Sequence, residues 1–223
     1  RTLRPRDAVR QPWLIILSDG SDVAYGYAAY IRWSLQSGLY WCRLIMEKCR
    51  IAPVNKLSTP QMELNAAVLS KRGRKVIESE MRFDFERVLQ LVDSETVLSM
   101  INKISTRFKV YEGVRVGEIQ AATDGDLSSW AWISGEDNTA DWLTQGRIPD
   151  QLGEDSYWWN GPPILYKPVE DWGLKFGMLK NEVLPVKRKF DTVQQPCQTN
   201  QYLITNSTVM STKSYGLSQE YLA

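Results

Sequence analysis

Histidine is absent from this 223-residue sequence, and its absence excludes several kinds of active site. A Ser-His-Asp triad, a Cys-His protease and a His-ligated zinc site cannot form without it. Cysteine is scarce as well: Cys42, Cys49 and Cys197 are odd in number and lack metal-ligand spacing. A disulfide scaffold is therefore not expected, and a reducing compartment suits the composition better. Acid–base chemistry in this chain must come from carboxylates, Lys, Tyr or metal-bound water.

Long apolar runs and a strong charge of one sign are also missing. Because no stretch of about 18 apolar residues occurs, we predict no membrane-spanning helix. We also expect no secretory signal. The formal net charge is +1, which excludes a strongly basic nucleic-acid coat but allows a local basic face. The 43% content of hydrophobic residues is enough for one domain with a real core and an appendage.

Apolar and turn-forming segments alternate along residues 13–147 and predict an α/β fold, a five-stranded mixed sheet flanked by helices. Strands are expected at 13–17, 24–33, 39–48, 87–92 and 129–134, and short links between the first three indicate an antiparallel meander. A helix capped by Thr59 is expected to carry Glu63 in its first turn. Further helices are expected after Ser94, over 108–122 before a turn at 123–126, and from Asn138 to near Gly146.

Changes in composition set the predicted boundaries on either side of this region. Residues 1–12 carry four arginines and two prolines and are interpreted as a connector arm. Residues 13–147 form the predicted domain. Residues 148–176 form an aromatic, Pro-rich extension, in which Tyr157, Trp158 and Trp159 are expected to pack against that domain. Residues 177–223 are rich in Gln, Asn, Ser and Thr, which indicates a polar, poorly ordered tail.

Four carboxylates stand at the ends of predicted elements: Asp19, Glu63, Asp93 and Asp141. Taken singly, each has an ordinary explanation as a turn residue, a helix-dipole acid, a helix cap or a surface acid. If the first and fourth strands are neighbours, Asp19 and Asp93 lie side by side, and a helix packed on the sheet brings Glu63 over them. Like charges so close together require cations. Oxygen ligands without His or Cys select Mg²⁺ or Mn²⁺, and two such ions are a standard device for hydrolysing phosphodiesters.

The ordered set resembles ribonuclease H, and in particular the ribonuclease H domain in the polyprotein of BEL/Pao-type LTR retrotransposons. The motifs that carry the resemblance are Asp19-Gly20-Ser21 with Ala24-Tyr25-Gly26, Pro60-Gln61-Met62-Glu63-Leu64, Asp93-Ser94 with Val97-Leu98, Arg107-Phe108-Lys109 with Arg115-Val116 and Glu118-Ile119, Asn138-Thr139-Ala140-Asp141 with Leu143-Thr144 and Gly146-Arg147, and Trp159-Asn160-Gly161-Pro162. Two departures stand out: Gly20, where Ala is commoner, and Thr139, where Pro is usual. Many ribonucleases H also carry a His before the last Asp, and residues 134–137 contain none.

The resemblance implies a ribonuclease H-like fold and an endoribonuclease that cuts the RNA strand of RNA–DNA hybrids during reverse transcription. It assigns Asp19, Glu63 and Asp93 to a metal-binding core and Asp141 to the second site of a two-metal-ion centre holding Mg²⁺ or Mn²⁺. It also implies a reverse transcriptase domain upstream in the parent polyprotein and a cytoplasmic retroelement particle. The candidate nucleic-acid contacts, each of which also has a plain structural explanation, are Ser21, Ser94, Lys71, Arg72, Arg74 and Lys75.

Two other function classes compete with the nuclease. A degenerate or domesticated fragment would hold nucleic acid or a neighbouring domain without cutting, and the sequence leaves this alternative open. A retroelement aspartic peptidase needs Asp-Thr-Gly or Asp-Ser-Gly, and neither tripeptide occurs in the chain. The peptidase is therefore not expected.

Overall fold

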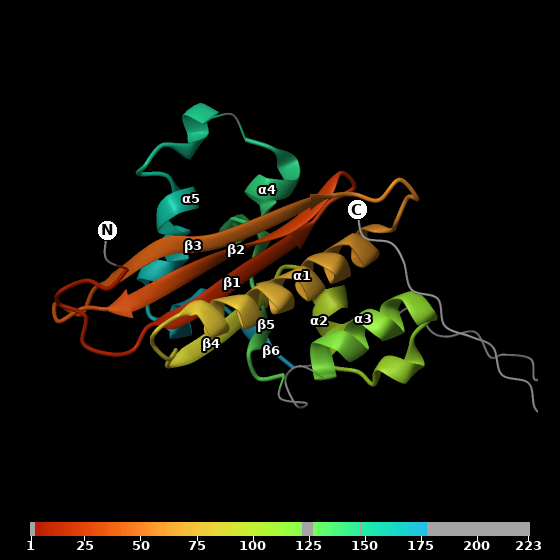
Figure 1. Cartoon of the computed structure of the whole chain (residues 1–223), viewed down its shortest axis with the longest axis horizontal. Coiled ribbons are helices and arrows are strands. Elements are labelled where there is room, and N and C mark those ends of the chain that lie inside the picture. Colours follow the sequence, from red (N-terminus) through yellow and green to blue (C-terminus); the bar gives the residue numbers. More distant parts are fainter. Residues whose placement is uncertain (1–2, 122–126, 148, 178–223) are drawn as a thin grey trace, which may run out of the picture. The chain divides into compact units, whose positions relative to one another are not determined.

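The structure is a computed structural model that describes residues 3–121, 127–147 and 149–177 (Figure 1). The described strands are β1 (Trp13–Gly20), β2 (Ala24–Ser34), β3 (Tyr40–Ile51), β4 (Arg87–Val92), β5 (Trp130–Trp132) and β6 (Lys175–Phe176). The described α-helices are α1 (Thr59–Glu80), α2 (Glu95–Ile101), α3 (Val110–Ala121), α4 (Asp141–Gln145) and α5 (Tyr157–Asn160). Short 3₁₀ helices occupy Ser105–Arg107, Gly135–Asp137, Pro149–Leu152, Pro163–Tyr166 and Val169–Trp172. The predicted turn at 123–126 and the predicted tail from 178 onward lie outside the described residues.

The six strands form one mixed sheet in the order β3-β2-β1-β4-β5-β6. The first three strands pair antiparallel, as predicted, whereas β4 lies parallel to β1 and β5 lies parallel to β4. The predicted class, a mixed α/β sheet flanked by helices, is confirmed. The sheet has one strand more than predicted because β6, only two residues long, adds antiparallel to β5. A strand this short has no apolar alternation that a sequence could reveal.

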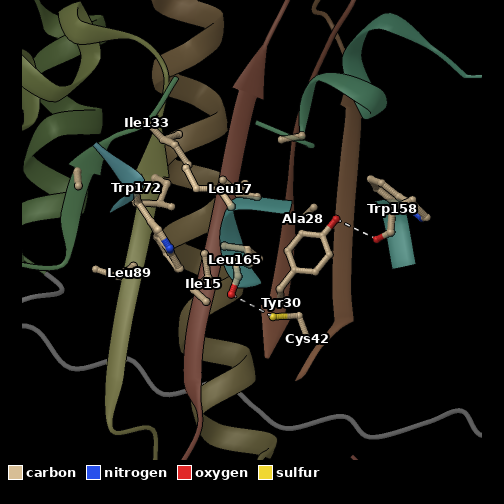
Figure 2. Packing of buried hydrophobic residues seen from close by; sticks show 14 residues of the cluster. Ile15, Leu17, Ala28, Tyr30, Cys42, Leu89, Ile133, Trp158, Leu165 and Trp172 are labelled. Carbon is tan, nitrogen blue, oxygen red and sulfur yellow. Dashed lines mark hydrogen bonds between the residues drawn. The ribbon is translucent and has the colours of Figure 1, made fainter. Parts of the chain in front are cut away.

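Strand β1 is buried on both faces, which explains its uninterrupted apolar run. Leu14 and Ile16 point to the face that carries α1, where they pack with Leu69 and Ile77 of that helix. Ile15 and Leu17 point to the opposite face and pack with Tyr30, Leu165 and Trp172, among others (Figure 2). Figure 1 shows α1 lying along the sheet with α2 and α3 beside it.

Helix α1 starts one residue earlier than predicted. Ser58, not Thr59, is the N-cap residue, and the Gln61 side chain accepts a hydrogen bond from the Ser58 N–H at 3.1 Å. Both Ser and Thr favour the cap position, so the sequence alone did not separate them. Glu63 is consequently the fifth residue of the helix and lies beyond its first turn, where the helix dipole has little effect.

Three other helix boundaries differ slightly from the predictions. Ser94 caps α2 as expected by accepting a hydrogen bond from the Val97 N–H at 3.3 Å, but the helix ends at Ile101 and leaves Ile104 exposed. Helix α3 begins at Val110, and the buried Phe108 precedes it. Helix α4 begins at Asp141, so the acid is its first residue.

The described part of residues 149–177 covers the face of the sheet opposite α1. Trp158, Leu165 and Trp172 are buried in the same cluster as Ile15 and Leu17 of β1. Contrary to the prediction, Tyr157 and Trp159 are exposed. The buried Arg32 of β2 ties this segment to the sheet, because its guanidinium donates to the Leu165 and Lys167 carbonyls, both at 2.7 Å. Residues 13–147 and this segment therefore share one core.

None of the described helices combines the length and apolar character that a membrane crossing requires.

Candidate metal centre

Three carboxylates converge at one end of the sheet. Asp19 is the last but one residue of β1, Asp93 directly follows β4, and Asp141 begins α4. The parallel register, which pairs Ser18 with Val92, sets the ends of β1 and β4 side by side. One carboxylate oxygen from each of the three residues lies within 4.8 Å of the others. The structure therefore brings together three of the four acids that the sequence singled out.

Burial and mutual repulsion disfavour the charged forms of two of these acids. The pKa of Asp141 is raised to about 7, first by burial and then by the charges of Asp19 and Asp93, while Arg147 and Gln145 oppose the shift. The pKa of Asp93 is also raised, mainly by burial and further by Asp19. A hydrogen bond from Asn138 lowers it in part. A centre of three carboxylates with this much uncompensated charge suits a hard divalent cation, which neutralises the charge through oxygen ligands.

Glu63 reaches the neighbourhood of the centre through the packing of α1 on β1. Gly20, next to Asp19, lies so close to α1 that a Cβ atom on it would sit 2.4 Å from the Met62 carbonyl carbon and 2.5 Å from the Glu63 nitrogen. Among the described residues, Glu63 does not join the cluster of three carboxylates. Its role as a metal ligand stays a prediction.

Helix α4 is fastened to the end of β1 by polar contacts that sequence reasoning missed. The Thr144 hydroxyl donates a hydrogen bond to the Asp19 carboxylate. The Ser21 hydroxyl lies 3.2 Å from the Thr144 carbonyl and donates to it. The Asn138 amide donates to the Ser18 carbonyl at 3.1 Å. Thr144 and Asn138 lie in motifs that the sequence highlighted, but their side-chain partners belong to a distant strand and left no local signal.

Residues 1–94 match the family described as Pao retrotransposon-like RNaseH-like domain. The resemblance inferred from the motifs is thereby confirmed for this part of the chain. The matched region carries Asp19, Glu63 and Asp93, and Asp141 lies beyond it. A comparison with curated proteins found no match.

Ribonuclease H domains are among the solved structures to which the chain is similar. The N-terminal RNase H domain of rv2228c from Mycobacterium tuberculosis is 16% identical, covers 60% of this chain and 92% of its own, and has a TM-score of 0.39. LC11-RNase H1, solved in complex with an RNA/DNA hybrid, is 12% identical, covers 64% of this chain and all of its own, and has a TM-score of 0.41. RNase H1 from Halobacterium salinarum NRC-1 is 12% identical, covers 61% of this chain and 96% of its own, and has a TM-score of 0.36.

A cavity adjoins the carboxylate centre on the α4 side. Its volume is about 390 Å³, and Asp141 contributes to its wall together with Trp142 and Arg147. The guanidinium of Arg147 lies 4.9 Å from the centre of the Trp142 ring. On the other side of the centre, the Trp132 indole N–H donates to the Asp93 carbonyl at 2.8 Å, which fixes the backbone of that acid.

The predicted nucleic-acid contacts divide into two groups. Ser21 and Ser94 are engaged within the chain, since Ser21 bonds to Thr144 and Ser94 caps α2. On α1, Arg72 makes a two-pronged ion pair with Glu118 at 2.7 Å, and Arg74 bonds to Glu78 and Ser129. In the part of the chain that the structure describes, no ion pair involves Lys71 or Lys75. All six assignments stay predictions.

Proposed function

We propose that this chain is a metal-dependent endoribonuclease that cuts the RNA strand of RNA–DNA hybrids during retrotransposon reverse transcription. The observation that carries the proposal is the convergence of Asp19, Asp93 and Asp141 within 4.8 Å of one another. They come from two strand ends and a helix start that are far apart in the sequence. Such a concentration of negative charge costs stability unless it serves to hold cations.

The donor set is suited to Mg²⁺ or Mn²⁺. Carboxylate oxygens are the ligands that hard divalent cations prefer, and Asp19, Asp93 and Asp141 would hold two such ions with Glu63 as a fourth ligand. When bound, the ions would supply an activated water and stabilise charge on the leaving oxygen. In the metal-free protein Asp141 is about half protonated near pH 7, because its pKa is raised to about 7. Metal binding would therefore release a proton and become tighter as the pH rises.

The remaining features of the proposal concern the substrate and its setting. An A-form-like hybrid is recognised mainly by its shape and 2′-hydroxyl groups, with little sequence reading. Lys71 and Lys75 lie four residues apart on α1 and share a face, so they are the two α1 cations best placed to meet phosphates. We place the activity in a cytoplasmic retroelement particle, downstream of a reverse transcriptase domain of the same polyprotein.

A cleavage assay with the full chain tests the proposal. A labelled RNA–DNA hybrid is incubated with Mn²⁺, with Mg²⁺ or with EDTA, using the natural chain, Asp93→Asn and Asp84→Asn. Cleavage should need the metal and fall about a hundredfold or more in Asp93→Asn, because several kcal/mol of transition-state stabilisation depend on an intact centre. Asp84→Asn, which alters an exposed carboxylate outside the centre, should cleave normally.

The same assay separates the nuclease from the binding module. Unchanged cleavage in Asp93→Asn would contradict the proposal. Hybrid binding by a folded natural chain without metal-dependent cleavage would favour the non-catalytic module instead. Gel-shift measurements on the same samples distinguish these outcomes.

A further inference from the structure

We infer that Thr144 is a positioning residue of the metal centre, whose hydroxyl holds the Asp19 carboxylate in its cation-binding orientation. The inference rests on the proposed function, because it takes the carboxylate centre to be a metal site. Thr144 belongs to α4, the helix that also supplies Asp141. It is only 2% exposed, so its hydroxyl needs a partner within the protein.

The hydroxyl group has two candidate acceptors and one hydrogen. Thr144 Oγ1 contacts a carboxylate oxygen of Asp19 and also lies 3.2 Å from the carbonyl oxygen of Asp141 in the preceding turn. A charged acceptor forms the stronger hydrogen bond, so the hydrogen points to Asp19. The bond engages the Oδ2 atom of Asp19 and leaves Oδ1 free of this contact.

A purely structural role for Thr144 is already served by its backbone. The Ser21 hydroxyl donates to the Thr144 carbonyl and joins α4 to the turn after β1. That contact would persist if the Thr144 side chain were replaced. The hydroxyl adds a second link, from α4 to the carboxylate itself, and this link couples the orientation of Asp19 to the position of Asp141. Partners that orient metal-binding groups in this way commonly contribute 10- to 100-fold to metal affinity, as an order of magnitude.

Metal affinity measured without nucleic acid tests the inference. Titration calorimetry with Mn²⁺ compares the natural full chain with Thr144→Val, which keeps the shape of the side chain and removes the donor, and with Thr144→Ser, which keeps the donor. We expect Thr144→Val to bind Mn²⁺ about tenfold more weakly or worse, and Thr144→Ser to bind like the natural chain. Thr106→Val, which removes an exposed hydroxyl elsewhere, is the matched control and should not change the affinity.

Cleavage kinetics add a second readout. If Thr144 positions Asp19, Thr144→Val should need a higher Mn²⁺ concentration for half-maximal cleavage and recover most of its kcat at saturating metal. Circular dichroism in EDTA verifies that each variant is folded. Should Thr144→Val fail to fold, Thr144→Ala, which also lacks the donor, takes its place in the titration.

The outcomes separate this inference from the proposed function. Natural affinity for Mn²⁺ in the variant without a hydroxyl would overturn the positioning role and leave the nuclease proposal intact. Equal weakening in Thr144→Ser and Thr144→Val would also overturn it, because packing and not the hydroxyl would then be responsible. Failure of the natural chain to bind Mn²⁺ would overturn both.

Discussion

Asp141 is the acid of the centre whose pKa is raised to about 7, first by burial and then by its neighbours. Its pKa of about 7 stands well above the ordinary value of 3.8, because burial and the charges of Asp19 and Asp93 oppose ionisation. Between these two pH values the folded protein binds a proton that the unfolded chain has already lost. The metal-free fold should therefore become less stable as the pH rises from about 4 to about 7.

Asp141→Asn is predicted to remove most of this pH dependence. In EDTA, the urea midpoint of the natural chain should fall between pH 5 and pH 8, whereas that of Asp141→Asn should change less and lie higher at pH 8. A smaller dependence of the same sign should remain, because the pKa of Asp93 is also raised. An unchanged pH profile in the variant would refute the assignment, and Mg²⁺ at pH 8 should stabilise the natural chain more than the variant.

The sequence predicted residues of this site only where a carboxylate lay at the end of a predicted strand or helix. Asp19, Asp93 and Asp141 each follow or begin a recognisable strand or helix, and the sheet register brings those ends together. Asn138 was expected only to start a helix and Thr144 only to lie within it, because the partners of their side chains, Ser18 and Asp19, are set by tertiary packing. Whether Glu63 completes the centre depends on a side-chain orientation, which a sequence pattern does not specify.

Helix α1 and strand β1 are in close contact at Gly20, and this contact sets the distance between the helix and the carboxylate centre. A Cβ on Gly20 would lie 2.4–2.5 Å from backbone atoms of Met62 and Glu63, closer than real Cβ contacts allow. Backbone atoms cannot move aside as a flexible side chain can. The helix can thus lie nearer to β1 with Gly20 than with the Ala that is commoner in the resembled family.

Gly20→Ala is predicted to push α1 away from the end of β1. We expect the free energy of unfolding to fall by about 1–3 kcal/mol, as for overpacked sites, and Mn²⁺ affinity to fall with it if Glu63 is a ligand. Gly153→Ala is the matched control, because nothing lies within 4 Å of the added methyl group. Denaturation by urea and Mn²⁺ titration measure both effects, and equal stability of the two variants would show that α1 is not held at this contact.

The pattern of apolar residues predicted which segments form strands and helices. The capping residues predicted the ends of these elements less accurately. The double-sided burial of β1 follows directly from the run of apolar residues between Trp13 and Asp19. The start of α1 was misplaced by one residue because Ser58 and Thr59 both favour the cap position. Strand β6 was missed because its two residues pair only after the chain has returned to β5.

The hydrophobic core of the described molecule includes the segment after α4, residues 149–177. The face of the sheet formed by Ile15, Leu17 and Tyr30 is covered by side chains of residues 149–177, including Leu165 and Trp172 (Figure 2). Tyr30 also donates to the Trp158 carbonyl at 2.9 Å and lies 3.0 Å from the Thr139 hydroxyl, so it joins this segment to the loop before Asp141. The sequence predicted that Trp158 packs against the domain, as it does, but composition did not reveal that the segment covers a face of the sheet.

Ending the chain after Arg147 is therefore predicted to destroy cooperative folding. The shortened chain would expose one apolar face of the sheet and should bind a hydrophobic dye and lose near-ultraviolet circular dichroism, while keeping part of its secondary structure. A chain ended after Gly177 retains the described contacts and should unfold cooperatively. Cooperative unfolding of the shorter chain at a similar urea concentration would show that the segment contributes little to the core.

The parallel pairing of β1 with β4 also sets when the carboxylate centre can exist. Trp13 pairs with Arg87 across the meander and the whole of α1, and such distant contacts form slowly because a long loop must close first. During synthesis, Asp19 leaves the ribosome well before α4 and the covering segment 149–177. Synthesis of Asp19, the first acid of the carboxylate centre, is therefore separated by a delay from the assembly of the complete centre.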